Sequence, residues 1–325
     1  MTSRRVVVCL LLGTLMAGLA AAEAIRVDAG ISSYKAVPGV SGILKSVGSD
    51  TMNNEMTLWA EGFRKFYPNV KIEIEGKGSS TAPPALTEGT AHFGPMSREM
   101  KSEEIDQFEK THGYKPTAVR TSVDMLAIYV HKDNPITCLS LPKVDAIFSK
   151  TRRGGMPADI ITWGEAGLTG PWASQPLSLY GRNSASGTYG YFKEHALFKG
   201  DYKDSVKEQP GSSSVVQRVA NDRYGIGYSG VGYRTADVKA IALSVKEGGA
   251  CVAPEPEPAY AGTYPLARFL YVYVNQKPSA PLDPLRLEFV KYVLSREGQE
   301  AVIKDGYLPL TAQMLDAEKA RLGIR

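Results

Sequence analysis

Histidine, cysteine and long apolar runs are all scarce in this chain of 325 residues. Its four histidines have no spacing typical of metal ligands, and none lies near a pair of cysteines, so a metal site is not expected. Past the first 21 residues, no apolar stretch reaches the roughly 20 residues that a transmembrane helix needs. The sequence therefore predicts a protein that needs no metal or other cofactor and has no membrane-spanning helix in its body.

Clusters of lysine and arginine are absent as well, although the formal net charge is +4. Arg4 and Arg5 supply two of the 38 basic residues, so the chain without residues 1–22 keeps 36 basic against 34 acidic residues, a net charge of +2. This balance is too even for a nucleic-acid-binding protein. Any anion that the protein binds must be held by a local site and not by a general positive field.

The composition is typical of a folded globular protein, with 43% hydrophobic and 22% charged residues. A length of 325 residues allows one large domain or two ordinary domains, each with its own core. No internal repeat and no low-complexity linker divides the chain.

The N-terminus has the pattern of a secretory signal peptide. Arg4 and Arg5 precede an apolar stretch at residues 6–21, and small residues follow at positions 20–22. We expect cleavage after Ala22, with Ala24 as the alternative, so that residues 1–22 are removed on export. A twin-arginine signal is a weaker alternative, because the residues expected after the arginine pair are missing.

Cys138 and Cys251 are the two cysteines that remain after this cleavage, since Cys9 lies within the signal. In an exported chain two cysteines form either a disulfide or two buried thiols. Their flanking residues are typical of loops or strand edges, which favours the disulfide.

Strands and helices alternate near the start of the mature chain. The alternation of Ile43, Lys45 and Val47 predicts a half-buried strand ending at Gly48, and a second strand is predicted at residues 70–74. The helix between them has apolar residues at steps of four, three, four and three: Met52, Met56, Trp59, Phe63 and Phe66. Asp50 or Thr51 is expected to cap that helix. Two such units in succession predict a parallel sheet.

Two later apolar runs, at residues 125–130 and 268–275, predict strands that cross between two lobes. The fold class is therefore α/β with two lobes joined by two hinge strands and a ligand cleft between them. We expect one discontinuous lobe from residues 40–130 and 264–325, and a second lobe from residues 131–263. Residues 254–258 (Pro-Glu-Pro-Glu-Pro) are expected to form an extended loop.

Three segments rich in glycine and hydroxyl residues follow strands and precede helices: residues 48–51, 78–81 and 182–188. Hydroxyls, free backbone N–H groups and helix N-termini are suited to a tetrahedral oxyanion, and Arg182 adds a formal charge. Taken alone, each segment could be an ordinary capped helix with no ligand. Three of them in one α/β chain are expected to meet at the carboxyl ends of the strands, where such folds bind ligands.

The pattern of these segments resembles the phosphate-binding proteins of bacterial phosphate ABC transporters, over about residues 42–310. Tyr264-Pro265-Leu266, before the returning strand, also fits that family. The resemblance implies a periplasmic, two-lobed solute-binding protein that holds inorganic phosphate and delivers it to a membrane ABC permease, and we expect it to be a monomer. The phosphate ligands that it implies are Thr51, the backbone N–H of Met52, Ser79, Arg182, Ser186, Gly187 and Thr188. Ser49, Asp50 and Ser80 are further possible contacts.

One position departs from the family. After Phe93-Gly94 better-known members carry an aspartate that accepts a proton from phosphate, whereas this chain has Ser97. A serine cannot demand a proton from the ligand, so discrimination against sulfate is expected to weaken unless Asp50 substitutes. Other oxyanions, such as sulfate or arsenate, therefore stay open as ligands.

An enzyme is the main alternative class, for example a secreted phosphatase. Ser140 and Lys143 fit a Ser-x-x-Lys pattern, but Pro142 between them disfavours a helical nucleophile–base pair. No Gly-x-Ser-x-Gly elbow is present, and no histidine lies in a setting typical of a catalytic triad. We therefore expect no enzymatic activity. A surface adhesin or sensor built on the same lobes stays open as a third class.

Overall fold

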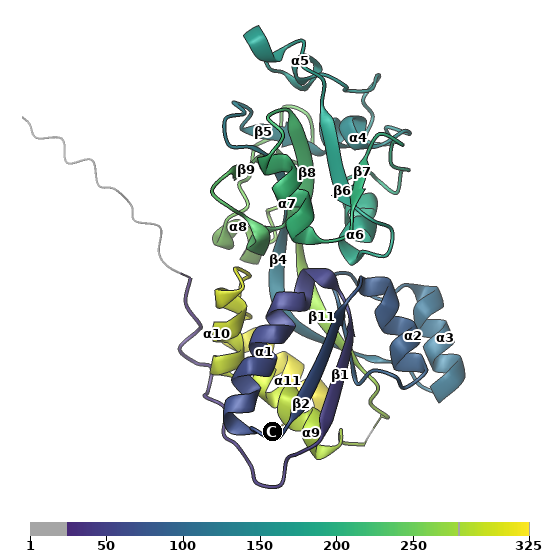
Figure 1. Ribbon diagram of the computed structural model, residues 1–325, viewed down its shortest axis with the longest axis vertical. Helices are drawn as coiled ribbons and strands as arrows, with labels where there is room; N and C mark the ends of the chain where they lie inside the picture. The colour runs from purple at the N-terminus through teal and green to yellow at the C-terminus, as the bar shows by residue number, and fades with distance from the viewer. Residues whose placement is uncertain (1–24, 279, 325) are drawn as a thin grey trace, which may run out of the picture.

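Two α/β lobes share one continuous path of β-strands in the computed structural model, which describes residues 25–278 and 280–324 (Figure 1). The strand order along this path is β2-β1-β3-β11-β4-β8-β6-β7, and β9 pairs with β4 beside it. The predicted signal peptide at residues 1–22 lies outside the described residues. Within them, no helix combines the length and apolar character needed to cross a bilayer.

The lower lobe in Figure 1 holds the parallel strands that begin the chain and the helices that end it. Its strands are β1 (Ile43–Gly48), β2 (Lys71–Gly76) and β3 (Phe93–Met96), and both β2 and β3 pair with β1 in parallel, as the sequence predicted. Its helices are α1 (Asn53–Phe66), α2 (Ala82–Thr87), α3 (Ser102–His112), α9 (Pro284–Val293), α10 (Arg296–Lys304) and α11 (Ala312–Leu322), with the short 3-10 turns η1 (Asp50–Met52) and η2 (Ser79–Thr81).

The upper lobe is formed by the middle of the chain. Its strands are β5 (Cys138–Ser140), β6 (Ser178–Arg182), β7 (Lys207–Gln209), β8 (Gly225–Gly230), β9 (Val238–Ala240) and β10 (Ala242–Ser244). Its helices are α4 (Leu141–Phe148), α5 (Trp163–Ala166), α6 (Gly187–His195), α7 (Ser212–Ala220) and α8 (Pro256–Tyr260), with 3-10 turns η3 (Gly170–Trp172) and η4 (Val231–Tyr233). Strand β6 pairs with β7 and β8 in parallel.

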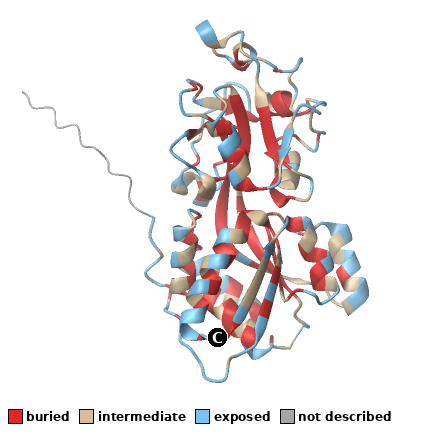
Figure 2. Ribbon diagram, in the orientation of Figure 1, coloured by how far each residue is buried: buried red, intermediate tan, exposed pale blue. Residues whose placement is uncertain are grey.

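Strands β4 (Thr117–His131) and β11 (Ala267–Val274) connect the lobes. The first half of β4 pairs with β11 as far as Met125, and from Leu126 onward β4 pairs with β8. The long strand thus belongs to the sheet of one lobe at its start and to the sheet of the other lobe at its end. Figure 2 shows that both crossing strands are buried along most of their length, as expected for apolar strands covered on two faces.

Helix α1 confirms the predicted periodicity. Met56, Trp59 and Phe63 are fully buried, whereas Phe66 at the C-terminal end is 37% exposed. The predicted cap is wrong, because neither Asp50 nor Thr51 makes a side-chain capping bond to the start of η1 or α1. The Asp50 carboxylate instead accepts a hydrogen bond from the backbone N–H of Ser212 in the other lobe, at 2.8 Å.

Two further local expectations need correction. In β1 the buried face carries Leu44 and Ser46, and Ile43 is 49% exposed; Lys45 reaches outward to form an ion pair with Glu73. Alternation in the sequence gave the strand but not which face the core covers. The expected loop at residues 254–258 contains the start of α8, since proline fits the first turn of a helix without losing a hydrogen bond there.

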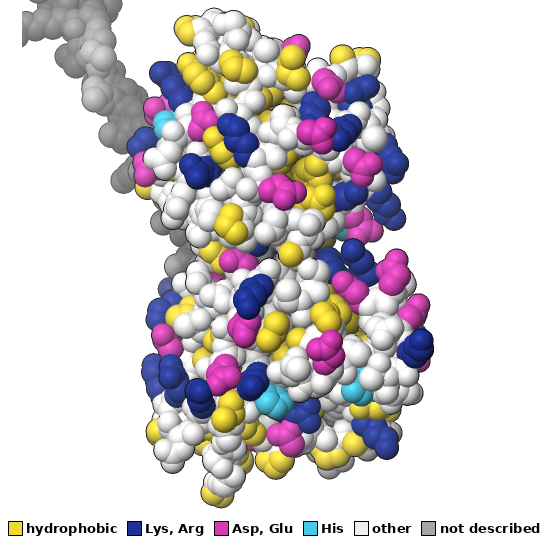
Figure 3. All heavy atoms as spheres, turned by 45° about the vertical axis from the view of Figure 1, so that its right-hand side comes forward, with side chains coloured by type: hydrophobic (Ala, Val, Ile, Leu, Met, Phe, Trp, Pro, Cys, Tyr) yellow, Lys and Arg dark blue, Asp and Glu magenta, His cyan; other side chains and the backbone are white. Residues whose placement is uncertain are grey.

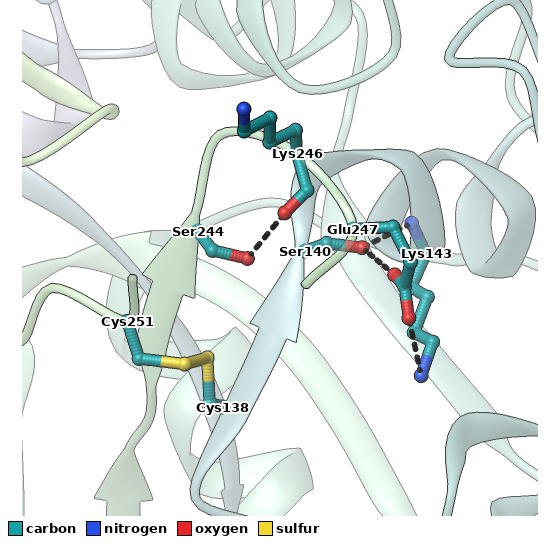
Figure 4. The surroundings of a disulfide bond; sticks show 7 residues. All are labelled: Cys138, Ser140, Lys143, Ser244, Lys246, Glu247 and Cys251. Atoms are coloured by element: carbon teal, nitrogen blue, oxygen red, sulfur yellow. Dashed lines mark hydrogen bonds and ion pairs between the residues drawn. A yellow bond between two sulfur atoms is a disulfide. The ribbon is translucent and has the colours of Figure 1, made fainter. Parts of the chain in front are cut away.

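The disulfide between Cys138 and Cys251 is present, as predicted (Figure 4). It lies beside the small parallel sheet of β5 and β10 and closes a loop with a sequence separation of 113 residues. Ser140 caps α4 by accepting a hydrogen bond from the backbone N–H of Lys143, and its hydroxyl donates to Glu247 at 2.6 Å. The Ser-x-x-Lys pattern is therefore part of a helix start.

Candidate anion-binding site

The three predicted segments lie together where the two lobes touch. Residues 48–51 begin with the last residue of β1, residues 182–188 begin with the last residue of β6, and residues 78–81 come after β2. Each segment therefore lies at the carboxyl end of a parallel strand. The Oγ1 atoms of Thr51 and Thr188 are 2.9 Å apart, across the two lobes. The N–H of Ser80 donates to the carbonyl of Ala185 at 3.1 Å. Both contacts place lower-lobe loops against the start of α6.

Ser49, Ser79 and Ser97 form a buried cluster of hydroxyls in the lower lobe. The Ser49 hydroxyl donates to Ser97 Oγ at 3.1 Å, and Ser79 Oγ lies 3.3 Å from Ser97 Oγ. The backbone N–H of Ser97 also donates to Ser79 Oγ, at 3.0 Å. All three side chains are at most 2% exposed, so the cluster presents its hydroxyls in a site that excludes bulk water.

Gly187 allows the first turn of α6 to approach this cluster. A Cβ atom at residue 187 would lie 2.3 Å from Ser79 Oγ and 2.6 Å from Ser97 Oγ, closer than any side chain can come. Only glycine fits here, for a steric reason. The neighbouring Ser186 is the N-cap of α6 and accepts hydrogen bonds from the N–H groups of Thr188 and Tyr189. The N-terminal end of the helix therefore points at the serine cluster.

Arg182 and Asp50 form a pair that joins the lobes, which we call the interlobe pair. The Arg182 Nη1 atom lies 3.1 Å from Asp50 Oδ2 and donates to Ser212 Oγ at 2.5 Å. The side chain of Arg182 is buried. In an ordinary capped helix with no ligand, this arginine would point into solvent. Burial lowers the pKa of Arg182, and the nearby Asp50 carboxylate opposes this shift. A buried guanidinium with a single, partly exposed carboxylate partner is well placed to receive an anion.

A second buried pair, Arg268 and Asp124, which we call the strand pair, lies on the crossing strands and was missed in the sequence. Arg268 faces Asp124 directly in the β11–β4 register. Its Nε and Nη2 atoms donate to Asp124 Oδ2 at 2.9 and 2.7 Å, and Nη2 also donates to Thr188 Oγ1 at 2.9 Å. One signal was available, since each of these residues is a charged residue beside an apolar run in its strand, and a buried charge needs a partner.

Ser212 is a third contributor that the sequence reading overlooked. It begins α7 after Gly211, in the run Gly-Ser-Ser-Ser at residues 211–214. Its hydroxyl lies 3.5 Å from Thr51 Oγ1, and its N–H donates to Asp50. The segment has the same glycine–hydroxyl composition as the other three and also separates a strand from a helix, so the same criterion would have found it.

Two predicted contacts occupy different positions from the rest. Ser80 is exposed and donates its hydroxyl to the carbonyl of Ala185, so it lies at the rim. The backbone N–H of Met52 is bonded to the carbonyl of Ser49 at 3.3 Å. Arg98, which follows Ser97, is held away by a two-point ion pair with Glu104.

The chemistry of this cluster is that of anion binding. It combines hydroxyl donors from both lobes with two guanidinium groups, and each guanidinium has one carboxylate partner, so the charged side chains are balanced before an anion is added. Among the residues from 25 to 324 that the structure describes, no group of three or more histidine, cysteine or acidic side chains could hold a metal ion. Figure 3 shows basic and acidic side chains interspersed over the visible face of both lobes.

Comparisons with known proteins agree on one family. A model of the PBP superfamily domain matches residues 33–297. The phosphate-binding protein PstS of Pseudomonas aeruginosa is 58% identical over 309 residues, which cover 95% of this chain and 96% of that protein.

Solved structures extend the similarity. A protein of Clostridium perfringens, described as a phosphate ABC transporter substrate-binding protein and solved with bound phosphate, is 25% identical with a TM-score of 0.71, covering 83% of this chain and all of that one. An ABC-type phosphate transport receptor of Vibrio cholerae has the same fold, with a TM-score of 0.64 at 21% identity over 82% of this chain and all of that one.

Proposed function

This chain belongs to the PstS-type phosphate-binding proteins of the PBP superfamily, and we propose that it captures inorganic phosphate and delivers it to a membrane ABC permease. The observation that carries this proposal is the buried guanidinium of Arg182, placed between lobes among hydroxyls that both lobes supply. The relatives are named as phosphate-binding transport proteins, so we propose a binding protein and not a phosphatase.

We propose that phosphate is held by Thr51, Met52, Ser79, Ser97, Arg182, Ser186, Gly187 and Thr188, with Ser49 and Asp50 in support. Hydrogen bonds to a charged group contribute about 1.5–3 kcal/mol each, and micromolar binding requires about 8 kcal/mol in total. A handful of donors can reach this total even after the anion loses its water. The Arg182 guanidinium supplies the charge, and the serine cluster supplies hydroxyl donors.

The lobes are expected to separate and close around the ligand. Residues 40–130 with 264–325 would move as one lobe and residues 131–263 as the other, and the change of pairing partner after Met125 in β4 supports a hinge there. Closure forms the Thr51–Thr188 contact and the interlobe pair, both of which join the lobes. A permease can then distinguish loaded from empty protein by the position of the lobes.

The location and assembly state are part of the proposal. A cleaved signal at residues 1–22 would place the mature protein in the periplasm, where a disulfide is stable. The Cys138–Cys251 bond supports this oxidising location. We propose that the protein acts there as a monomer.

Isothermal titration of the purified protein with phosphate, sulfate and arsenate tests the function. We expect phosphate to bind best, and arsenate next because it shares the charge and shape of phosphate. If sulfate binds more tightly than phosphate, the proposed ligand is wrong and sulfate takes its place in the proposal. Release of phosphate from a phosphomonoester by the same preparation, absent in the Arg182→Ala variant, would favour the enzyme alternative.

A further inference from the structure

Arg268 uses its whole guanidinium group to join three parts of the molecule. Besides its two bonds to Asp124, its Nη1 atom donates to the carbonyl of Ser97 at 2.7 Å and its Nη2 atom to Thr188 Oγ1 at 2.9 Å. The side chain is 6% exposed and Asp124 is fully buried. Arg268 therefore connects the crossing strands both to the serine cluster of the lower lobe and to the start of α6 in the upper lobe.

The bond from Arg268 fixes the direction of the hydroxyl of Thr188. A guanidinium has only donors, so Thr188 Oγ1 must accept, and its own proton is left to point elsewhere. The hydroxyl within reach of this proton is Thr51 Oγ1, 2.9 Å from Thr188 Oγ1. On its other side, Thr51 Oγ1 lies 3.5 Å from Ser212 Oγ. Ser212 in turn accepts from Arg182 at 2.5 Å.

The result is a row of three hydroxyls, Thr188, Thr51 and Ser212, with an arginine donating at each end. Both terminal hydroxyls accept from the arginines, so each keeps its own proton to donate, either to Thr51 or to an anion bound beside the row. A row held in this way offers hydrogen-bond donors to a bound oxyanion. Without Arg268, the hydroxyl of Thr188 could rotate and present a lone pair to the anion, which would repel it.

We infer that Arg268 is a positioning residue of the phosphate site, which orients the Thr188 hydroxyl as a donor and holds the Ser97 backbone in place; this inference rests on the proposed function. Asp124 keeps the guanidinium in register, accepting from the N–H of Val231 through its Oδ1 atom at 3.2 Å as well. The Asp124 carboxylate also neutralises the charge of Arg268. Arg268 therefore contributes by orienting neighbouring groups more than by attracting the anion. A lysine has three donors, but all of them are on one nitrogen, so it cannot reach Asp124, the Ser97 carbonyl and Thr188 Oγ1 as the planar guanidinium does.

A double-mutant cycle with phosphate as the titrant tests this role. Arg268→Gln together with Asp124→Asn removes the strand pair without leaving a buried charge, and Thr188→Val removes the hydroxyl at nearly constant size. In the wild-type background the paired substitution should weaken phosphate binding about 10- to 100-fold, the range of a charged hydrogen bond. In the Thr188→Val background the loss should be at least threefold smaller, because the hydroxyl to be oriented is gone.

A merely structural arginine would lower the unfolding temperature and weaken binding equally in both backgrounds. Losses that differ by less than threefold, or no loss in the wild-type background, overturn the inference. If the paired variant does not fold by circular dichroism, Arg268→Lys takes its place in the cycle, with the same expectation and the same threshold.

Arg120→Gln is the matched control. Arg120 also lies on β4, but it is half exposed and pairs with Glu318 of α11, 3.9 Å away, so phosphate affinity should stay within twofold. Wild-type protein that fails to bind phosphate overturns the proposed function and this inference together. Wild-type protein that binds phosphate, with equal losses in the cycle, overturns the inference alone.

Discussion

The interlobe pair and the strand pair contain the same chemical groups but are built in different ways. Arg182 ends β6 and Asp50 begins η1, in different lobes, and their contact exists only while the lobes are together. Arg268 and Asp124 face each other across two adjacent strands, so sheet register holds them whether the lobes are open or closed. The comparison suggests a division of roles, with the interlobe pair binding the anion directly and the strand pair orienting the groups that do.

The largest effect is expected at the interlobe pair. Arg182→Ala should reduce the free energy of phosphate binding by about 2–5 kcal/mol, because a buried dianion would lose its main cationic partner. The remaining Asp50 carboxylate is a quarter exposed and can be solvated, so the unfolding temperature without ligand should change little.

Calorimetric titration and a thermal melt of the same sample measure both quantities. If Arg182→Ala binds phosphate within threefold of the wild type, or loses less affinity than removal of the strand pair, the proposed division of roles fails.

A region remote from both pairs should affect stability without affecting affinity. Replacing Cys138 and Cys251 by serine should lower the free energy of unfolding by about 2–4 kcal/mol, since the disulfide restrains a long loop in the unfolded chain. Phosphate affinity should stay within twofold. Urea denaturation followed by tryptophan fluorescence gives the first value, and titration gives the second.

Protein alkylated without reduction should carry no label at either cysteine. A large loss of affinity in the serine variant would mean that the upper lobe transmits strain to the site, and the two pairs would then not explain binding by themselves.

The surroundings of the strand pair predict a pH dependence that the interlobe pair does not. Burial, and then the charge of Asp124, raise the pKa of Asp305 from its ordinary value of 3.8 to about 7. Because the unfolded chain releases this proton more readily, the free energy of unfolding should fall by about 1–3 kcal/mol as pH rises from about 4 to 7, and then level off.

Denaturation at a series of pH values measures this fall, and Asp305→Asn should flatten it. Glu55 is buried nearby and its pKa is raised as well, so it should add to the fall in the same direction. A curve that is unchanged by Asp305→Asn would show that this carboxyl is ionised throughout the range.

The smallest effect concerns selectivity. Asp50→Asn removes the carboxylate that repels a fully deprotonated anion such as sulfate, so the ratio of phosphate affinity to sulfate affinity should fall about threefold to tenfold. Competitive titration with both anions measures the ratio. The Asp50 carboxylate accepts a hydrogen bond from the backbone N–H of Ser212 and pairs with Arg182. An asparagine keeps an oxygen that can still accept the bond from Ser212. An unchanged ratio would limit Asp50 to joining the lobes.

The sequence was most informative where the structure is local. Alternation and helical periodicity predicted β1, α1 and β2, and glycine with hydroxyl residues marked three of the four strand-to-helix junctions that meet at the site. The predicted signal peptide favoured the disulfide. Each of these signals lies within a few residues, where backbone preference and side-chain spacing decide the outcome. The burial of Leu44 and Ser46 in place of Ile43 shows the limit, since alternation cannot say which face the core will cover.

The sequence by itself determined the two-lobed α/β fold and indicated an oxyanion as the ligand, because repeated strand–loop–helix units and oxyanion donors are local patterns. Only the tertiary structure decided which charges meet. Arg268 and Asp124 are 144 residues apart, and Asp50 meets Arg182 only because two lobes fold against each other. A contact of that kind depends on sheet register and on lobe packing, and both result from the combined interactions of many residues. No short segment carries that information.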